Sequence, residues 1–522
     1  MNATRTQARR TDAALVVGNV LWNAAASLLG SVIAFLLVPF LLHGLGDAAY
    51  GVWALVGSVF AHSVVFQLGL ASAINRFVPV RLASGDHEGL RAVVSTCTAF
   101  LSFMALVVLA LTLVLHQWLT QIFQIPPALA ADARICVLVV GGCAALGAIT
   151  SAAGAVLSGY QRYDLMAGSR LSVTLVRSAL LVALLMQGFG LVTVALLYGL
   201  GELVVNALNL AFCLRLLPER PFALRAVDAG LLREMLGYGF NTFNYVLGAL
   251  LLLKAGELLI GIFRSAEEVA QYAIVSAAVL TLTTVIEAFC AAIKPAASDL
   301  DTHGDRTRLK QLLLLSQKYS LFLILPSAAF LLIMGREFLL IWTQKDFPLL
   351  PTALALVAAG HAVRLSQHSS FFVLVGMGEH RYFGLLMLSM AVGTVTLGWL
   401  ALAVLDLGLL GIAAASAIPL FVGCGIFLPR HVYGKLGVGG AESLRQVWIP
   451  ALLGAAPGLA LLVACKLARP PRGWVELLLL VATVAAATAL GAWRLGLGDS
   501  ERARLSNLAR GQWSKLAGAR TG

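Results

Sequence analysis

The chain has 522 residues, of which 60% are hydrophobic and only 12% are charged, whereas about a quarter of the residues in a soluble domain are charged. This composition excludes an ordinary soluble enzyme and predicts a protein that crosses a membrane many times. The net charge of +12 comes from basic residues beside apolar segments, which is typical of membrane topology and lipid contact rather than of nucleic-acid binding.

Apolar segments long enough to span a bilayer, which requires about 20 residues, follow one another along most of the chain. We place about fourteen of them, at 13–42, 49–75, 92–117, 132–158, 168–187, 191–214, 236–263, 270–293, 316–335, 350–376, 383–405, 409–429, 446–467 and 474–493. The first is longer than the apolar part of a cleavable signal peptide, so we expect it to stay in the membrane. Because helices satisfy their own backbone hydrogen bonds within lipid, the predicted fold class is an all-α polytopic membrane protein.

Basic residues assign the polar segments to the two sides of the membrane. One side collects the clusters at 76–91, 215–233 and 294–318 together with the tail at 495–522. The segment from Gln117 to Asp132, predicted on the other side, has no basic residue. Since cytoplasmic loops carry the excess of lysine and arginine, we predict that both termini are cytoplasmic.

A pattern recurs along the chain at a nearly fixed separation. Five residues of the first copy are matched 219 positions later: Asn75, Gly85, Asp86, Leu90 and Arg91 by Lys294, Gly304, Asp305, Leu309 and Lys310. Agreement on one separation favours a duplicated unit, with chance alignment of similar apolar segments as the alternative. Six helices per unit, an even number, would make the two units parallel repeats.

The duplication predicts six regions along the chain. They are a cytoplasmic N-terminal tail at 1–12, an N-terminal six-helix lobe at 13–214, a cytoplasmic linker at 215–235, a C-terminal six-helix lobe at 236–434, an extra helix hairpin at 446–494 and a basic cytoplasmic tail at 495–522. The tail either lies along the inner leaflet as an amphipathic stretch or is frayed.

Ionisable residues within apolar segments are energetically expensive, so they are the first candidates for function. His361, Arg364 and His368 are spaced to share one face of the predicted helix over 350–376, with Arg364 near the middle of the bilayer. The residues beside Arg364 are histidines rather than acids. For this arginine we therefore favour a water-filled cavity.

Other predicted spans carry further candidates, each with a simpler alternative. Lys254 and Glu257, three residues apart, either neutralise each other or take part in function. Arg177 either faces a cavity or extends its side chain to the lipid headgroups. Glu202, Glu257 and Glu287 are the acids at which a proton or sodium ion would couple to transport.

The sequence contains no Walker A, HExxH or GxSxG motif. Its seven cysteines are scattered with no CxxC spacing, so it predicts neither a zinc site nor a disulfide framework. No polar segment is large enough to form a catalytic domain outside the membrane. We therefore predict a transporter with no catalytic residue, no metal and no cofactor, and keep a membrane-embedded enzyme as an alternative.

Short motifs occur in order between residues 13 and 434. They are Gly-Leu-Gly-Asp-Ala-Ala-Tyr at 44–50, Gln-Leu-Gly-Leu-Ala-Ser-Ala-Ile-Asn-Arg at 67–76 with Ser-Gly-Asp at 84–86, Gly-Tyr-Gln-Arg at 159–162, Gly-Arg-Glu-Phe-Leu-Leu-Ile-Trp at 335–342 and Leu-Gly-Ile-Ala-Ala-Ala at 410–415. Together they resemble polysaccharide flippases of the multidrug/oligosaccharidyl-lipid/polysaccharide exporter superfamily.

The resemblance implies a two-lobed transporter that moves an undecaprenyl-diphosphate-linked oligosaccharide from the inner to the outer leaflet, for lipopolysaccharide, capsule or exopolysaccharide assembly. It implies a location in the bacterial plasma (inner) membrane. The implied partners are the lipid-linked glycan, membrane lipids and the glycan polymerase machinery, with no nucleic acid. The diphosphate would be bound by Arg364, Lys254, Arg177, His361 and His368.

Two alternatives to this function stay open, a drug/cation antiporter of the same superfamily and a membrane enzyme of glycan assembly. The lipid II flippase branch has basic residues toward the start of its first helix, whereas the segment 13–42 has none. This difference counts against a peptidoglycan precursor as the substrate.

Overall fold

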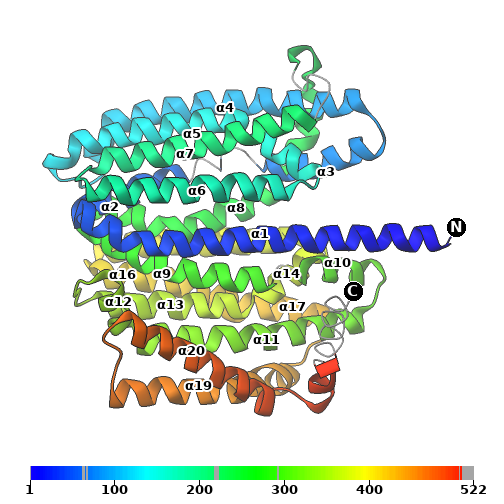
Figure 1. The fold of residues 1–522 in the computed structure, drawn as a ribbon, viewed down its shortest axis with the longest axis vertical. Helices are drawn as coiled ribbons and strands as arrows, with labels where there is room; N and C mark the ends of the chain where they lie inside the picture. The colour runs from blue at the N-terminus through cyan, green and yellow to red at the C-terminus, as the bar shows by residue number, and fades with distance from the viewer. Residues whose placement is uncertain are drawn as a thin grey trace, which may run out of the picture. The chain divides into compact units, whose positions relative to one another are not determined.

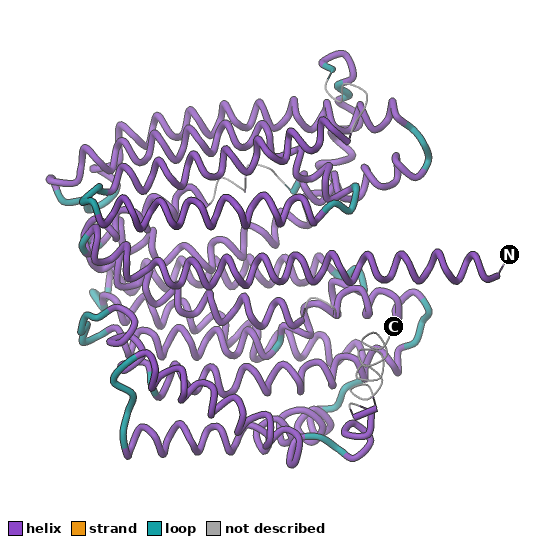
Figure 2. The backbone as a smooth tube through the Cα atoms, in the orientation of Figure 1, coloured by secondary structure: helices purple, strands orange, loops and turns teal. Residues whose placement is uncertain are grey.

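The structure, a computed structural model, describes residues 2–61, 65, 69–216, 223–290, 293–504 and 506–507. These residues form helices joined by short loops, with no β-strand among them (Figure 2). The all-α prediction is therefore confirmed. Residues 217–222 of the predicted linker and residues 508–522 of the predicted amphipathic tail lie outside the described part of the chain.

The chain forms two compact units, each made of three segments. The first unit, Met1–Ala291, Phe347–Val357 and Glu379–Gly423, contains α1 (Asn2–Leu45), α2 (Asp47–Ala61), α3 (Leu70–Ala83), α4 (His87–Ile122), α5 (Ala130–Gly159), α6 (Tyr163–Met186), α7 (Leu191–Leu216), α8 (Ala229–Phe263), α9 (Ala266–Cys290), α15 (His380–Trp399) and α16 (Gly408–Val422).

The second unit comprises Ala292–Asp346, Ala358–Gly378 and Cys424–Gly522. Its helices are α10 (Ile293–Thr302), α11 (Arg306–Ile333), α12 (Gly335–Thr343), α14 (His368–Gly376), α17 (Leu428–Leu436), α18 (Gly440–Ser443), α19 (Ile449–Ala468) and α20 (Trp474–Gly491). α13 (Leu350–Ser366) contributes residues to both units.

Twelve helical segments of the described chain are long and apolar enough to cross a membrane. The other two predicted spans are each divided between two helices. Residues 49–75 fall on α2 and α3, and residues 350–376 fall on α13 and α14, which are separated at Gln367. The chain is thus an all-helical protein that crosses a membrane many times.

In the first unit, α5 packs against both α4 and α7, and α6 packs against α7 (Figure 1). Small residues permit this close approach, as is common between helices in membranes. A side chain at Gly141 of α5 would collide with Thr112 of α4, and one at Gly199 of α7 would meet the Cys143 sulfur at 2.8 Å. The packing therefore depends on glycine at both contacts.

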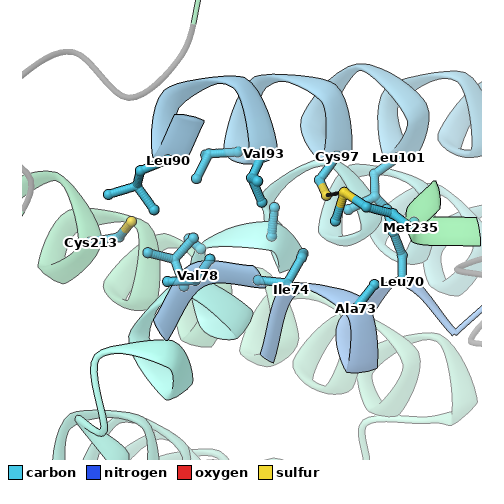
Figure 3. Close-up of a cluster of buried hydrophobic side chains, with 14 of the residues drawn as sticks. Leu70, Ala73, Ile74, Val78, Leu90, Val93, Cys97, Leu101, Cys213 and Met235 are labelled. Atoms are coloured by element: carbon cyan, nitrogen blue, oxygen red, sulfur yellow. Dashed lines mark hydrogen bonds between the residues drawn. The ribbon is translucent and has the colours of Figure 1, made fainter. Parts of the chain in front are cut away.

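An apolar core holds the short helix α3 in this unit (Figure 3). Leu70, Ile74 and Val78 lie four residues apart on α3, so they share one face, and all three are buried. Cys97 of α4 is buried in the same core, with its sulfur 3.8 Å from that of Met235 in α8. This cysteine acts as a small apolar residue, as expected.

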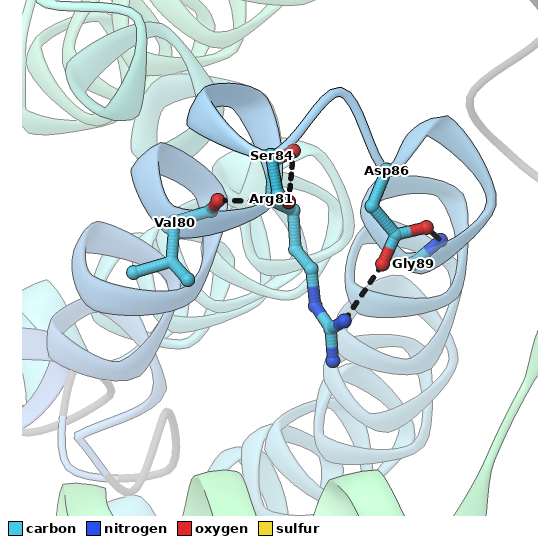
Figure 4. A network of polar contacts seen from close by, with 5 residues as sticks. All are labelled: Val80, Arg81, Ser84, Asp86 and Gly89. Carbon is cyan, nitrogen blue, oxygen red and sulfur yellow. Dashed lines mark hydrogen bonds and ion pairs between the residues drawn. The ribbon is translucent and has the colours of Figure 1, made fainter.

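The turn between α3 and α4 is built around a glycine and an aspartate. Gly85 has a left-handed backbone with φ of 68°, which glycine adopts without a steric cost. Asp86 caps α4 by accepting a hydrogen bond from the Gly89 N–H at 2.8 Å, and it forms an ion pair with Arg81 at 2.7 Å (Figure 4). The Gly89 N–H and the Arg81 guanidinium together lower the pKa of the Asp86 carboxyl.

The same turn occurs 219 residues later, between α10 and α11. Gly304 also has φ of 68°, and Asp305 caps α11 by accepting a hydrogen bond from the Arg308 N–H at 3.0 Å. Five backbone hydrogen bonds of the first turn have an equivalent in the second, each shifted by 219 residues. The separation found in the sequence thus extends to local backbone structure.

In the second unit, the hairpin of α19 and α20 packs against α11. Leu462 of α19 is fully buried in a small core with Met334, which follows α11. Lys318 of α11 is also buried, and its ammonium lies 2.5 Å from the Glu501 carboxylate. The residues of the predicted extra hairpin are therefore an integral part of this unit.

Candidate substrate-binding site

The first unit contains a cavity of about 570 Å³ among α2, α4, α5, α6 and α7. Pockets that bind small molecules commonly have volumes of roughly 300–1,000 Å³ and combine apolar walls with a few polar groups. Most of this wall is apolar, and its polar members are Ser151, Arg170, Tyr198, Glu202 and Asn206. The cavity is therefore suited to an amphipathic ligand.

Small residues on one face of α5 leave the space open. Ala144, Gly147, Ala148 and Ser151 follow one another at intervals of three, one and three residues, so they share a helical face, and all four line the cavity. A side chain at Gly147 would point toward the Asn206 amide, 3.1 Å away. Larger residues here would fill the cavity.

The opposite wall comes from α7, where Tyr198, Glu202 and Asn206 are four residues apart and share a face. Arg177 of α6 lies against this wall. Its guanidinium is 4.0 Å from the centre of the Tyr198 ring and 3.7 Å from a Glu202 oxygen. The Arg177 side chain is only 15% exposed, whereas that of Glu202 is 55% exposed. Arg177 thus positions the tyrosine and the glutamate, and the glutamate stays accessible.

A second charged group of this unit is centred on Glu257 of α8. Its buried carboxylate accepts a hydrogen bond from Ser58 of α2, and the Lys254 ammonium lies 3.0 Å from both carboxylate oxygens. The buried residues Tyr50 and Tyr272 interact electrostatically with the same carboxylate. In this arrangement the charges of Lys254 and Glu257 neutralise each other.

The predicted continuous helix over 350–376 is interrupted, so His368 does not continue the helix that carries His361 and Arg364. His368 begins α14 after the break at Gln367, and it is buried edge-on against Phe372, with 5.0 Å between ring centroids. His361 and Arg364 are half-buried. Arg364 still lies close enough to His368 for an electrostatic interaction.

A buried polar network accompanies the break between α13 and α14. The Gln317 amide of α11 donates a hydrogen bond to the Gln367 carbonyl oxygen at 3.0 Å, and Ser370 donates to the same oxygen at 3.0 Å. The Tyr433 hydroxyl donates to Gln317 at 3.0 Å. Irregular backbone at membrane depth is tolerated where protein groups surround it and satisfy its polar atoms.

The structure thus places the predicted site residues in three groups. In the first unit, Arg177 lies beside Glu202 and Lys254 beside Glu257, while in the second unit Arg364 lies near His368. Glu287 is on the exposed side of α9 and is not among the residues that line the cavity.

Sequence reasoning missed three residues of the cavity, namely Trp53, Arg170 and Tyr198. The spacing of Tyr198 with Glu202 and Asn206 was the available signal, because three polar residues at four-residue intervals lie on one face of a helix. Trp53 gave no signal, since a tryptophan in an apolar segment is usually a packing residue.

Comparison with protein families places a match over more than half of the chain. The family described as "Polysaccharide biosynthesis protein" matches residues 45–345. Among curated proteins, the chain is 23% identical over 412 residues to "Uncharacterized membrane protein EpsK" of Bacillus subtilis (strain 168). That match covers 78% of this chain and 81% of the relative.

Two kinds of solved structure share the fold. "Lipid II flippase MurJ, inward closed conformation" is 13% identical with a TM-score of 0.66, and the match covers 91% of this chain and 97% of that one. A multidrug resistance MATE family transporter of the MOP superfamily, in an inward-facing conformation, is 16% identical with a TM-score of 0.62, covering 81% and 96%. Both neighbours are named as transport proteins rather than enzymes.

Proposed function

Because the chain belongs to the polysaccharide biosynthesis protein family, we propose that it is a flippase for an undecaprenyl-diphosphate-linked oligosaccharide. It would move this lipid from the inner to the outer leaflet of the bacterial plasma membrane, for lipopolysaccharide, capsule or exopolysaccharide assembly. The observation that carries the proposal is the cavity of the first unit, where charged and polar groups line a space within membrane helices. Such groups are expensive in a membrane and commonly mark a substrate pathway.

We assign the diphosphate of the substrate to Arg364, with His361 and His368 beside it. A guanidinium presents paired N–H donors that match phosphate oxygens. Arg364 is half-buried and lies three residues before the break in its helix. Lys254 and Arg177 are further candidates, but each lies beside a glutamate that it would have to leave.

The membrane potential supplies a driving force for the proposed transport without ATP. Moving negative charge outward across an inside-negative membrane releases about 2.3 kcal/mol per charge per 100 mV. Glu202, Glu257 and Glu287 are the acids at which a proton or sodium ion would couple in addition. Both termini would be cytoplasmic, and two lobes would alternate in exposing the substrate to the two leaflets.

Deletion of the gene tests the proposed function. We expect surface polysaccharide to be lost and lipid-linked repeat units to accumulate in the inner leaflet. Drug sensitivity with normal surface polysaccharide would instead indicate a drug/cation antiporter. Lipid-linked units that reach the outer leaflet but are not polymerised would indicate an enzyme of glycan assembly.

Arg364 variants test the diphosphate assignment in the complemented deletion strain. Arg364→Ala should abolish export while the protein is still inserted, and Arg364→Lys should retain part of the activity because it keeps the positive charge. Normal export by Arg364→Ala would overturn the assignment. Membrane abundance measured by immunoblot controls for loss of the protein.

A further inference from the structure

We propose that the cavity of the first unit binds neutral sugar rings of the lipid-linked glycan rather than its diphosphate. The proposal rests on the proposed function and specifies which part of the substrate this cavity takes. Its physical basis is the combination of an aromatic wall, hydrogen-bonding groups and nearly balanced charge within one space of about 570 Å³.

The aromatic wall consists of Trp53 from α2 and Tyr198 from α7. Their ring centroids are 4.9 Å apart and the rings are tilted by 54°, so the two faces form an angled apolar surface. A sugar ring has apolar C–H faces and a hydroxylated edge, and aromatic side chains offer a large apolar area with a defined orientation. The pair therefore matches the face of a sugar ring.

The polar wall matches the edge of the ring. Glu202 accepts hydrogen bonds, whereas the Asn206 amide both donates and accepts them, as sugar hydroxyls require. Both side chains line the cavity, four residues apart on α7. One wall of the cavity thus offers stacking and hydrogen bonding from a single helix face.

Charge argues against a diphosphate in this cavity. Its lining contains one cation, Arg170, and one anion, Glu202. Arg177, the nearby second cation, is mostly buried and is held between the Tyr198 ring and Glu202. A ligand with about two negative charges would face the carboxylate, whereas a neutral sugar would use it as an acceptor.

Cys143 provides a native reporter, because it lines the cavity and is partly exposed. Five of the other six cysteines are buried, and Cys465 alone among the remainder is partly exposed. In a Cys465→Ser background, a water-soluble methanethiosulfonate reagent should therefore modify Cys143 in the purified, detergent-solubilised protein. Absence of modification would overturn the proposal, since a sugar site must admit water.

Protection of Cys143 distinguishes the two parts of the substrate. Lipid-linked glycan extracted from the deletion strain should slow modification at least fivefold, whereas farnesyl diphosphate, which has the diphosphate but no sugar, should slow it less than twofold. Equal protection by both would overturn the proposal, and so would protection by neither. If the extract fails to protect while gene deletion still abolishes export, only this inference falls; if deletion leaves export intact, the proposed function falls.

Substitutions in the aromatic wall identify the residues responsible. Trp53→Leu should weaken protection by the glycan extract at least tenfold, and Trp53→Phe should retain most of it because a ring remains. Trp118→Leu removes an exposed tryptophan of α4 outside the cavity and should leave protection unchanged. Asn206→Ala gives an independent test if Trp53→Leu unfolds. Undiminished protection in folded Trp53→Leu and Asn206→Ala proteins would overturn the proposal.

Discussion

α5 of the first unit and the pair α13 and α14 correspond in the duplicated pattern, yet they carry different residues along their length. α5 begins at Ala130 and α13 at Leu350, 220 positions apart. The residues with positive φ in the turns that follow, Gln161 and Gly378, are 217 positions apart. Backbone features therefore stay in register to within three residues.

Within that range, Arg364 corresponds to Gly147 or Ala144 of α5, and both of these small residues line the cavity. The first copy has an uninterrupted helix with an open space beside it, whereas the second has an arginine and a break at Gln367. Duplicated sequences can thus keep the backbone of their turns while interior positions diverge into separate roles. Each prediction below changes one copy and compares the result with the other.

The largest expected effect concerns α8, whose Lys254 and Glu257 lie 219 positions after the apolar residues Phe35 and Val38 of α1. Glu257→Ala removes the carboxylate that pairs with Lys254 at 3.0 Å. Breaking a buried ion pair in this way should lower the free energy of unfolding by about 3–5 kcal/mol. Thermal unfolding in detergent measures the loss.

The double variant Lys254→Met with Glu257→Ala controls for the buried charge. It should recover a substantial part of the stability, since no uncompensated ammonium is left. A single variant as stable as the parent would show that the pair contributes nothing to the fold.

The next effect concerns the open space beside α5. Gly147→Leu should fill the cavity and reduce export of surface polysaccharide at least tenfold, which corresponds to about 1.4 kcal/mol. Gly142→Leu on the same helix is the matched control, because no atom lies within 4 Å of a side chain added there. Export at the parental rate by an inserted Gly147→Leu protein would exclude the cavity from the transport route.

The two duplicated turns should respond equally to loss of their glycines. Gly85→Ala and Gly304→Ala each place a side chain on a residue with φ of 68° but in open space. Each should therefore cost about 1 kcal/mol from backbone conformation alone. Chemical denaturation of the two variants measures the costs, and a clear inequality between them would mean that the surroundings of the turns differ.

The smallest effect separates the two turns by pH. Asp86 has Arg81 beside it, whereas the residue 219 positions after Arg81 is Leu300. Because the pKa of Asp86 is lowered, its stabilisation of the turn is complete above the ordinary carboxyl pKa and is lost as pH falls through the lowered value. Arg81→Leu should raise the pKa of Asp86 only partway, since the larger contribution of the Gly89 N–H remains.

Hydrogen exchange of peptides covering residues 84–90, followed from about pH 3 to pH 6, measures this change. Arg81→Leu should begin to lose protection at a higher pH than the parent. An unchanged profile would mean that the arginine does not influence the aspartate.

Sequence patterns predicted the helical fold and the separation of 219 residues because both depend on local requirements. Length and hydropathy determine which segments can cross a membrane, and the turns need glycine at Gly85 and Gly304 for their positive φ. The break at Gln367 could not be predicted in this way. No proline or glycine marks it, and its hydrogen-bond partner Gln317 lies 50 residues away in the sequence.

The cavity was also beyond local reasoning. Glu202 and Arg177 could be selected as charges in apolar segments, but their position beside Tyr198 depends on how α6 packs against α7. Which small residues leave space, such as Gly147, depends likewise on the faces that neighbouring helices present. Tertiary packing therefore decided the part of the site that the sequence could not indicate.

The pairing of Lys318 with Glu501 imposes an order on how the protein is made. The two residues are 183 positions apart, and ribosomes add about 5–20 residues per second. α11 therefore waits roughly ten to forty seconds, at that rate of synthesis, before the acid that neutralises its lysine emerges. During this interval the ammonium must remain near water or beside the insertion machinery, so docking of the segment that carries Glu501 is a late step in the biogenesis of this unit.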